Sequence, residues 1–169
     1  MRRFMVVLAF LIAAHPEQAS SQAFGPEVVW GDDTDIGIGG RVELGIGSAL
    51  ASSGLWSQAA LAGAFDYFFP DCSDEADCSY WELHGDLLVP ITAASINPYL
   101  GAGLHLAHAS VDIDVGEFDG GGSSSDVGID VLGGLRFSLG TLSAFTELRL
   151  ELIGAEQFEI GGGLLFGQR

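Results

Sequence analysis

Hydrophobic and polar residues alternate with a period of two along much of the chain. In the segment 79–91, Leu83 and Leu87 fall on one set of alternate positions, and Glu82 and His84 fall on the other. Successive side chains of a β-strand point to opposite faces, so this pattern predicts strands with one apolar and one polar face. The segments that show it are 34–47, 55–69, 79–91, 97–109, 126–139, 142–153 and 156–166, with 27–30 as a short additional strand.

Eight strands separated by turns and loops predict an all-β fold, a single eight-stranded antiparallel up-and-down barrel. A soluble ligand-binding barrel of the lipocalin type would place the apolar face inside and a charged face in water. Here the polar face is rich in small residues such as Gly37, Ala62 and Gly103, which relieve crowding in a narrow interior. The apolar face carries no charge. We therefore expect a transmembrane β-barrel with this face against lipid.

Aromatic residues and loop lengths both predict that the two ends of the barrel differ. The aromatic residues expected in one interfacial girdle are Tyr67, Phe69, Trp81 and Phe158, and those in the other are Phe137 and Phe166. The long or acidic connections are 31–34, 70–79, 110–126 and 153–156, and the short uncharged ones are 47–54, 92–95 and 139–143. Outer-membrane barrels place long loops outside and short turns in the periplasm, so we expect both termini to be periplasmic.

The N-terminus is typical of an exported protein. Arg2 and Arg3 precede an apolar stretch of eleven residues, 4–14, and the small-x-small pattern of a signal-peptidase site occupies 21–23. Eleven apolar residues are too few for a transmembrane helix, which needs about 20, although an uncleaved anchor is the alternative interpretation. The predicted domains are a signal peptide, residues 1–23, and one barrel domain, residues 24–169.

The chain is strongly acidic, with a net charge of −17 and no lysine. Such a charge disfavours nucleic acid and the anionic cytoplasmic leaflet as partners. The two cysteines, Cys72 and Cys78, have five residues between them. In an exported protein this spacing predicts one disulfide closing a short loop, and no His/Cys cluster nearby completes a zinc site.

Phrases such as INPYLGAGLHLA and the closing FEIGGGLLFG resemble the OmpA/OmpX-like superfamily of small outer-membrane β-barrels. The resemblance covers residues 24–169 and implies a Gram-negative outer membrane, with its lipid, lipopolysaccharide and barrel-assembly machinery as partners. Members usually end on an aromatic residue that the assembly machinery reads. Here Phe166 is followed by three more residues, so that signal is displaced.

An eight-stranded barrel is just wide enough for side chains to fill its lumen. The charged residues and histidines predicted to face inward are Arg41, Glu43, Asp66, Glu82, His84, Asp86, His105, Asp130, Arg136, Glu147, Arg149, Glu151 and Glu159. Eight of these are acids and only three are arginines, so some carboxylates should be protonated, hydrated or share a cation. The set is interpreted as a structural charge network, with a narrow gated proton or cation path as the alternative.

The acidic loops contain weak candidates for Ca²⁺ ligands. Candidate Ca²⁺ ligands around the predicted disulfide are Asp71, Asp74, Glu75 and Asp77, and further acids in the long loop are Asp112, Asp114, Glu117 and Asp119. Neither stretch has the spacing of an EF-hand loop. A solvated anionic surface is the preferred interpretation, with divalent cations or a protein partner at the loops as further possibilities.

One pair of residues has the composition of a catalytic site. His108 and Ser110 are two apart on one strand face, and Asp112 or Glu117 would supply an acid for serine activation. The pair loosely resembles the outer-membrane lipid A deacylase family, which follows its serine with asparagine where this chain has Val111. We expect no catalytic residues and no cofactor.

The sequence therefore favours a non-enzymatic outer-membrane barrel with a charge-filled lumen, acting as a structural or surface-interaction protein through acidic extracellular loops. Two alternatives stay open at this point: a narrow ion or small-solute pore, and a lipid A-modifying hydrolase. No motif for phosphate, dinucleotide, haem or nucleic-acid binding accompanies them.

Overall fold

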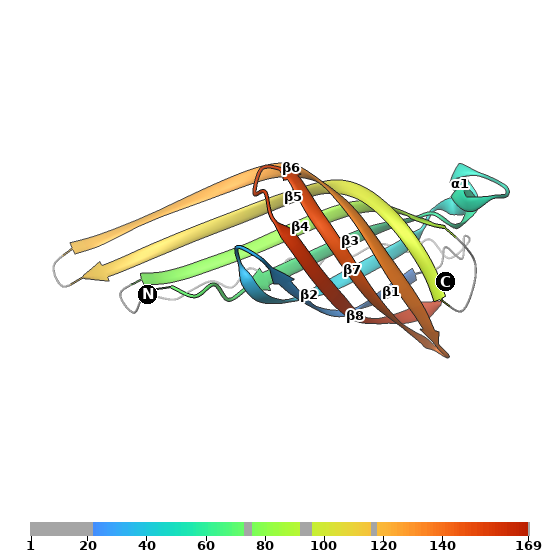
Figure 1. Cartoon of the computed structure of the whole chain (residues 1–169), viewed down its shortest axis with the longest axis horizontal. Coiled ribbons are helices and arrows are strands. Elements are labelled where there is room, and N and C mark those ends of the chain that lie inside the picture. The colour runs from blue at the N-terminus through green and yellow to red at the C-terminus, as the bar shows by residue number, and fades with distance from the viewer. Residues whose placement is uncertain (1–21, 73–75, 92–95, 116–117, 169) are drawn as a thin grey trace.

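The computed structural model describes residues 22–72, 76–91, 96–115 and 118–168. They form a closed antiparallel barrel in which each strand pairs with the next and the last pairs with the first, confirming the predicted fold (Figure 1). Its strands are β1 (Gln22–Gly31), β2 (Asp35–Gly45), β3 (Ala60–Phe68), β4 (Ala76–Pro90), β5 (Ile96–Val115), β6 (Phe118–Leu139), β7 (Leu142–Ile153) and β8 (Phe158–Gln168).

Closure between β1 and β8 brings the described ends of the chain together. Gln22 pairs with Leu44 on one side and with Gln168 on the other. Strand β1 thus begins two residues before the predicted mature N-terminus, and Ala23 packs in a buried cluster with Phe145 and Leu165. Cleavage after Ala23 stays a prediction, and it would remove this contact.

The alternating pattern separates an apolar exterior from a polar interior. Val127, Leu104 and Leu100 are 68%, 61% and 58% exposed, and large aliphatic side chains surround the barrel in the same way. Water-soluble proteins do not expose a continuous apolar belt of this kind, whereas lipid requires one. The predicted interfacial aromatics share this outward face: Tyr67, Phe69 and Phe166 are exposed, and Trp81, Phe137 and Phe158 are half-buried.

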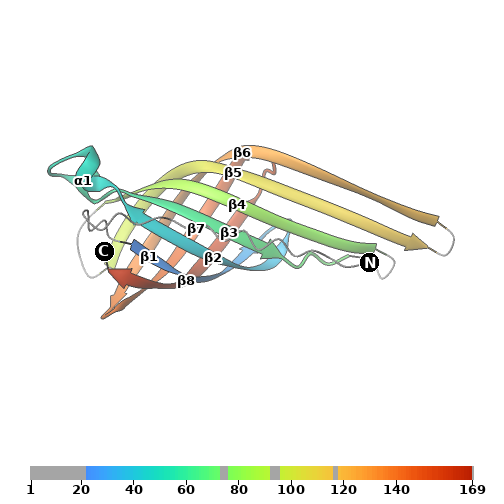
Figure 2. The ribbon, with the colours of Figure 1, turned by 180° about the vertical axis from the view of Figure 1, so that it is seen from behind.

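The segment 110–126, predicted to be a long loop, is instead the end of a β-hairpin. Strands β5 and β6 continue pairing to Val115 and Phe118, so their far ends project beyond the rest of the barrel (Figures 1 and 2). The prediction was wrong because Gly120–Ser125 in this projection is exposed to solvent on both faces and therefore carries no apolar alternation. Backbone pairing alone defines the strands there.

The opposite end of the barrel holds a second departure from the prediction. Residues 55–58, assigned to a strand by the pattern, form a short 3₁₀ turn, η1 (Leu55–Gln58), after the single-turn helix α1 (Gly47–Leu50). Gly54, with φ of 83°, makes the reversal between them, a conformation that favours glycine. Among the described residues, no helix is long and apolar enough to cross a membrane.

The predicted disulfide is present. Cys72 and Cys78 are bonded, with their Cα atoms 6.3 Å apart, where the connection after β3 meets the start of β4. It lies at the same end of the barrel as the projecting hairpin, because Cys78 pairs with Val111 of β5.

Small residues on the inner face should be required for packing. A Cβ at Gly103 would overlap Asp86 Oδ1 and the Gly85 carbonyl oxygen, whereas a Cβ at Gly85 would meet nothing within 4 Å. We expect Gly103→Ala to lower the free energy of unfolding by about 1–3 kcal/mol and Gly85→Ala to leave it unchanged or raise it. Urea unfolding of the refolded protein measures both. Equal losses would contradict the assigned inner face.

Candidate functional site

The lumen contains the densest set of charged groups in the molecule. All thirteen residues predicted to face inward are buried, none more than 5% exposed. They come from β2 to β8, so every strand but β1 supplies at least one. Sequence reasoning missed one further buried acid, Glu27 of β1, because the four-residue strand expected there was too short to show which face its glutamate occupies.

Near the end that carries the chain termini, two arginines neutralise the lumen acids. Arg41 lies 2.9 Å from Glu147 Oε2, 3.2 Å from Glu43 Oε1 and 3.7 Å from Glu27 Oε2. Arg136 donates to Glu43 Oε1 at 2.6 Å. Each guanidinium also lies over an aromatic ring, Arg41 over Phe145 at 4.7 Å and Arg136 over Tyr99 at 5.4 Å. Such contacts suit the weakly hydrated, planar guanidinium.

At mid-height, Arg149 is the centre of the network. Its nitrogens lie 2.8 Å from Asp130 Oδ2, 3.0 Å from Asp86 Oδ2, 3.1 Å from Glu147 Oε1 and 3.5 Å from Glu159 Oε2. One buried arginine therefore contacts four carboxylates, each from a different strand. Removing it would leave several buried charges uncompensated, the costly outcome for an internal ion pair.

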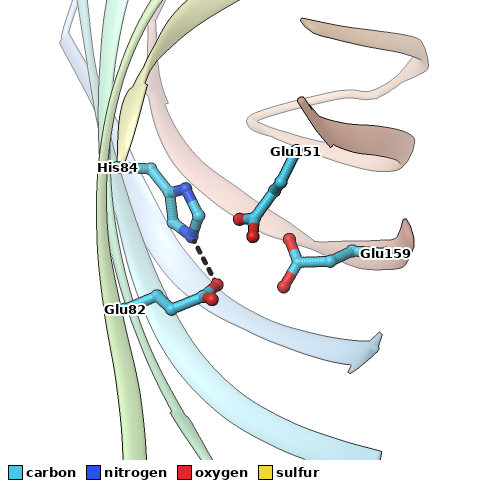
Figure 3. A group of neighbouring side chains, drawn as sticks. All are labelled: Glu82, His84, Glu151 and Glu159. Carbon is cyan, nitrogen blue, oxygen red and sulfur yellow. Dashed lines mark ion pairs between the residues drawn. The ribbon is translucent and has the colours of Figure 1, made fainter. Parts of the chain in front are cut away.

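Toward the end with the projecting hairpin, the composition of the lumen changes. Glu82 and His84 of β4 face Glu151 of β7 and Glu159 of β8, and the four side chains point toward one another (Figure 3). We call them the four-ligand group. One ligand atom from each lies within 4.8 Å of the others, and all four residues are buried. No sequence motif marks this group, because β4 meets β7 and β8 only across the closed barrel.

Uncharged polar residues lie between the four-ligand group and the hairpin end of the lumen. Gln157 donates to Glu82 Oε1 at 2.7 Å and to Glu159 Oε1 at 3.3 Å, and it accepts a hydrogen bond from Thr34 at 3.1 Å. Tyr80 also donates to Glu82 Oε1. Deeper in the lumen, a void lined by Glu27, Val29, Asp66, Phe145, Glu147, Arg149, Glu159 and Gly161 measures only about 10 Å³. This is at most the room that one water molecule needs, so this part of the lumen is filled.

The serine-activating pair considered as an alternative, His108 and Ser110, has other hydrogen-bond partners in the structure. His108 Nδ1 is hydrogen-bonded to Ser125 Oγ at 2.7 Å, and Ser110 shares a hydrogen bond of 2.7 Å with Ser79. Cross-strand pairing explains this, because Ser125 lies opposite His108 and Ser79 lies opposite Ser110. Of the two acids considered, Asp112 is exposed, and Glu117 lies outside the described residues. The hydrogen bonds of His108 and Ser110 therefore do not support the hydrolase alternative.

The Ca²⁺ candidates of the loop receive little support from geometry. Asp71 and Asp77 are exposed, while Asp74 and Glu75 lie outside the described residues. Within the described part of the chain, only the four-ligand group brings three or more ligand atoms together. The side chains of Asp114 and Asp119 are likewise outside what the structure describes.

The lumen network should contribute strongly to stability, and unequally between its arginines. We expect Arg149→Met to lower the free energy of unfolding by about 3–5 kcal/mol, because four carboxylates lose their shared cation. Arg136→Met, which removes contacts to one carboxylate and one ring, should cost less. Urea unfolding followed by tryptophan fluorescence compares the two. A larger loss for Arg136→Met would contradict the central position given to Arg149.

Comparison with known proteins finds similarity in structure alone. No protein-family model matches the sequence, and a search of curated proteins finds no match either. Among solved structures, the N-terminal barrel of Pseudomonas aeruginosa OprF matches with a TM-score of 0.61 and 16% identity, covering 88% of this chain and 97% of that one.

Two further solved structures match over a similar extent. Neisserial surface protein A, NspA, has a TM-score of 0.56 at 16% identity, covering 86% of this chain and 95% of its own. The attachment invasion locus protein of Yersinia pestis, Ail, has a TM-score of 0.53 at 14% identity, covering 88% and 96%. The closed barrel, its strand number and these matches together show that the chain has the fold of the small OmpA-like outer-membrane β-barrels.

Proposed function

We propose that this chain is a non-enzymatic resident of the bacterial outer membrane that acts as a surface-interaction protein, with its acidic end outside the cell. The apolar exterior supports residence in a membrane, because a belt of exposed Leu, Ile, Val and Phe surrounds the barrel. Residues 1–23 would be removed on export, and the described chain ends would lie in the periplasm.

The observation that carries the proposal is the distribution of exposed charge. The exposed acids of the described residues are Asp32, Asp33, Asp35, Asp71, Asp77, Asp112, Asp126 and Glu156. They lie in or beside the β1–β2, β3–β4 and β7–β8 connections or in the projecting hairpin, and alternating strand direction puts all of these at one end of the barrel. The connections at the other end, 46–59 and 140–141, contain no charged residue. A single-sign field at one end attracts partners of opposite charge and repels others.

The projecting hairpin supplies a surface suited to binding. Strand β4 pairs with β5 as far out as the pair Ala76–Ile113, and β5 pairs with β6 along its whole length. Strand β6, however, pairs with β7 only from Ile129 onward. Its segment from Phe118 to Gly128 therefore has one unpaired edge among the described strands, and such an edge can accept a strand from another protein.

Charge complementarity favours a partner with a basic surface. A solved structure of Ail holds the heparin analogue sucrose octasulfate, a polyanion. A polyanion is disfavoured here, because the exposed end of this barrel is itself acidic. Lipopolysaccharide phosphates would contact the same acids only through bridging divalent cations. A chelator therefore abolishes binding to lipopolysaccharide and leaves binding to a basic protein unchanged.

The predicted orientation can be tested with the native cysteines. After mild reduction of intact cells, a membrane-impermeant maleimide should label Cys72 and Cys78, because their disulfide lies at the acidic end. A Ser57→Cys variant in a Cys72→Ser/Cys78→Ser background should stay unlabelled until the cells are opened, since Ser57 lies in η1 at the other end. The reverse result would place the acidic end in the periplasm.

A photo-crosslinking amino acid tests the interaction itself. Placed at Ile113 on the projecting hairpin, it should capture a protein in intact cells, whereas placed at Leu139 near the opposite end it should not; both side chains are exposed. The triple variant Asp71→Asn/Asp77→Asn/Asp112→Asn should lower the yield from Ile113 several-fold, because the attraction is electrostatic. Undiminished yield in that variant, or capture abolished by a chelator, would contradict a basic protein partner.

A further inference from the structure

The four-ligand group has unmet bonding capacity in a buried place. Glu151 is 4% exposed, and neither of its carboxylate oxygens has a hydrogen-bond partner among the described residues. Its one ion-pair contact among the described residues is with His105 Nδ1, at 3.7 Å, and needs a protonated histidine. Glu82 Oε2 and His84 Nε2 also lack hydrogen bonds, although they lie 3.2 Å apart as an ion pair. A buried carboxylate without a partner is strongly disfavoured.

The arginines do not supply partners for these unbonded atoms of the four-ligand group. Arg41 and Arg136 make their ion pairs with Glu27, Glu43 and Glu147, lower in the lumen. Arg149 touches the four-ligand group through Glu159 Oε2, at 3.5 Å, and through His84 Nδ1, at 2.8 Å. Three carboxylates thus converge on one imidazole, and Figure 3 shows the Glu151 and Glu159 carboxylates directed toward Glu82 and His84. A cation placed among them would meet all four.

We propose that Glu82, His84, Glu151 and Glu159 bind one divalent transition-metal ion inside the barrel, a site beyond the surface interaction proposed above. One imidazole nitrogen with carboxylate oxygens suits Zn²⁺ or a neighbouring first-row ion, whereas Ca²⁺ and Mg²⁺ prefer oxygen ligands throughout. Ligand atoms up to 4.8 Å apart must move closer to bind at about 2.0–2.2 Å. The glutamate side chains have the rotatable bonds to do so.

Neighbouring groups would hold the ligands in place. Gln157 and Tyr80 both donate to Glu82 Oε1, which leaves Oε2 for the metal. His84 Nδ1 lies 3.4 Å from Asp130 Oδ2, an acceptor for the Nδ1 proton when Nε2 binds the ion. In that tautomer Arg149 would no longer donate to His84, but it would keep its bonds to Asp86 and Asp130.

Refolding the full barrel with and without Zn²⁺ tests the site. After removal of free metal, elemental analysis should find one Zn²⁺ per chain, retained in a large excess of Mg²⁺ and Ca²⁺. Co²⁺ as a second probe should give the visible absorption bands of an ion bound by nitrogen and oxygen. The urea midpoint should rise with Zn²⁺, because a ligand that binds only the folded state stabilises it.

Two matched variants locate the ion. Glu151→Gln should weaken Zn²⁺ binding roughly 100-fold or more, since it removes a ligand rather than one of the outer partners whose loss costs about 10–100-fold. Glu27→Gln removes a lumen carboxylate outside the group and should leave binding unchanged. Should Glu151→Gln fail to fold, as judged by gel mobility before and after heating, Glu82→Gln replaces it.

Three outcomes would overturn the metal site. The first is no retained Zn²⁺ in the wild-type barrel. The second is undiminished binding in the folded glutamine variant, which would move the ion to the exposed loop acids. The third is that Glu27→Gln weakens Zn²⁺ binding as much as Glu151→Gln does, which would show that binding depends on the total charge of the lumen and not on the four-ligand group. None of these outcomes bears on the partner of the hairpin, whose crosslinking test uses a different part of the chain.

Discussion

A charged side chain in the lipid-facing wall of this barrel has one direction in which to point. The outer face must be apolar, and closure of β1 on β8 satisfies the backbone hydrogen bonds without leaving an edge in lipid. Charged residues are therefore forced into a lumen that eight strands make only wide enough for side chains. The nine buried acids and three buried arginines must find their partners within that space.

The way in which the lumen meets this constraint differs along its length. Near the chain termini, Arg41 and Arg136 pair with the acids of their own level, and Arg149 binds four carboxylates at mid-height. Between Arg149 and the hairpin end, no further arginine of the described residues faces the lumen, and the acids meet histidines instead. Histidine carries a positive charge only when it is protonated, so the charge balance at that level is less fixed than at the levels of the arginines. Glu151 at that level leaves both carboxylate oxygens without a hydrogen-bond partner among the described residues, and the proposed ion would bind there.

The sequence predicted the features that the alternation of apolar and polar residues encodes. The fold and the inward direction of residues such as Arg41 and Glu82 follow from alternation against an apolar belt. The projecting part of β5 and β6 was missed because lipid does not contact it, so its glycines and serines show no alternation. The convergence of His84 with Glu151 could not be predicted, because it depends on how the closed sheet curves. The alternative that paired His108 with Ser110 followed the strand, whereas the structure pairs His108 with its cross-strand neighbour Ser125.

The same constraint explains why barrels at 14–16% identity share this fold. Lipid specifies the class of residue on the outer face, and many sequences meet that requirement. Interaction with other molecules is then left to the regions that lipid does not constrain, which are the interior and the projecting end. In this chain the charged residues of the interior are buried, so they cannot present a surface to a macromolecule. The acidic hairpin can, and a buried ion would strengthen the strands β4, β7 and β8 that form the wall below it.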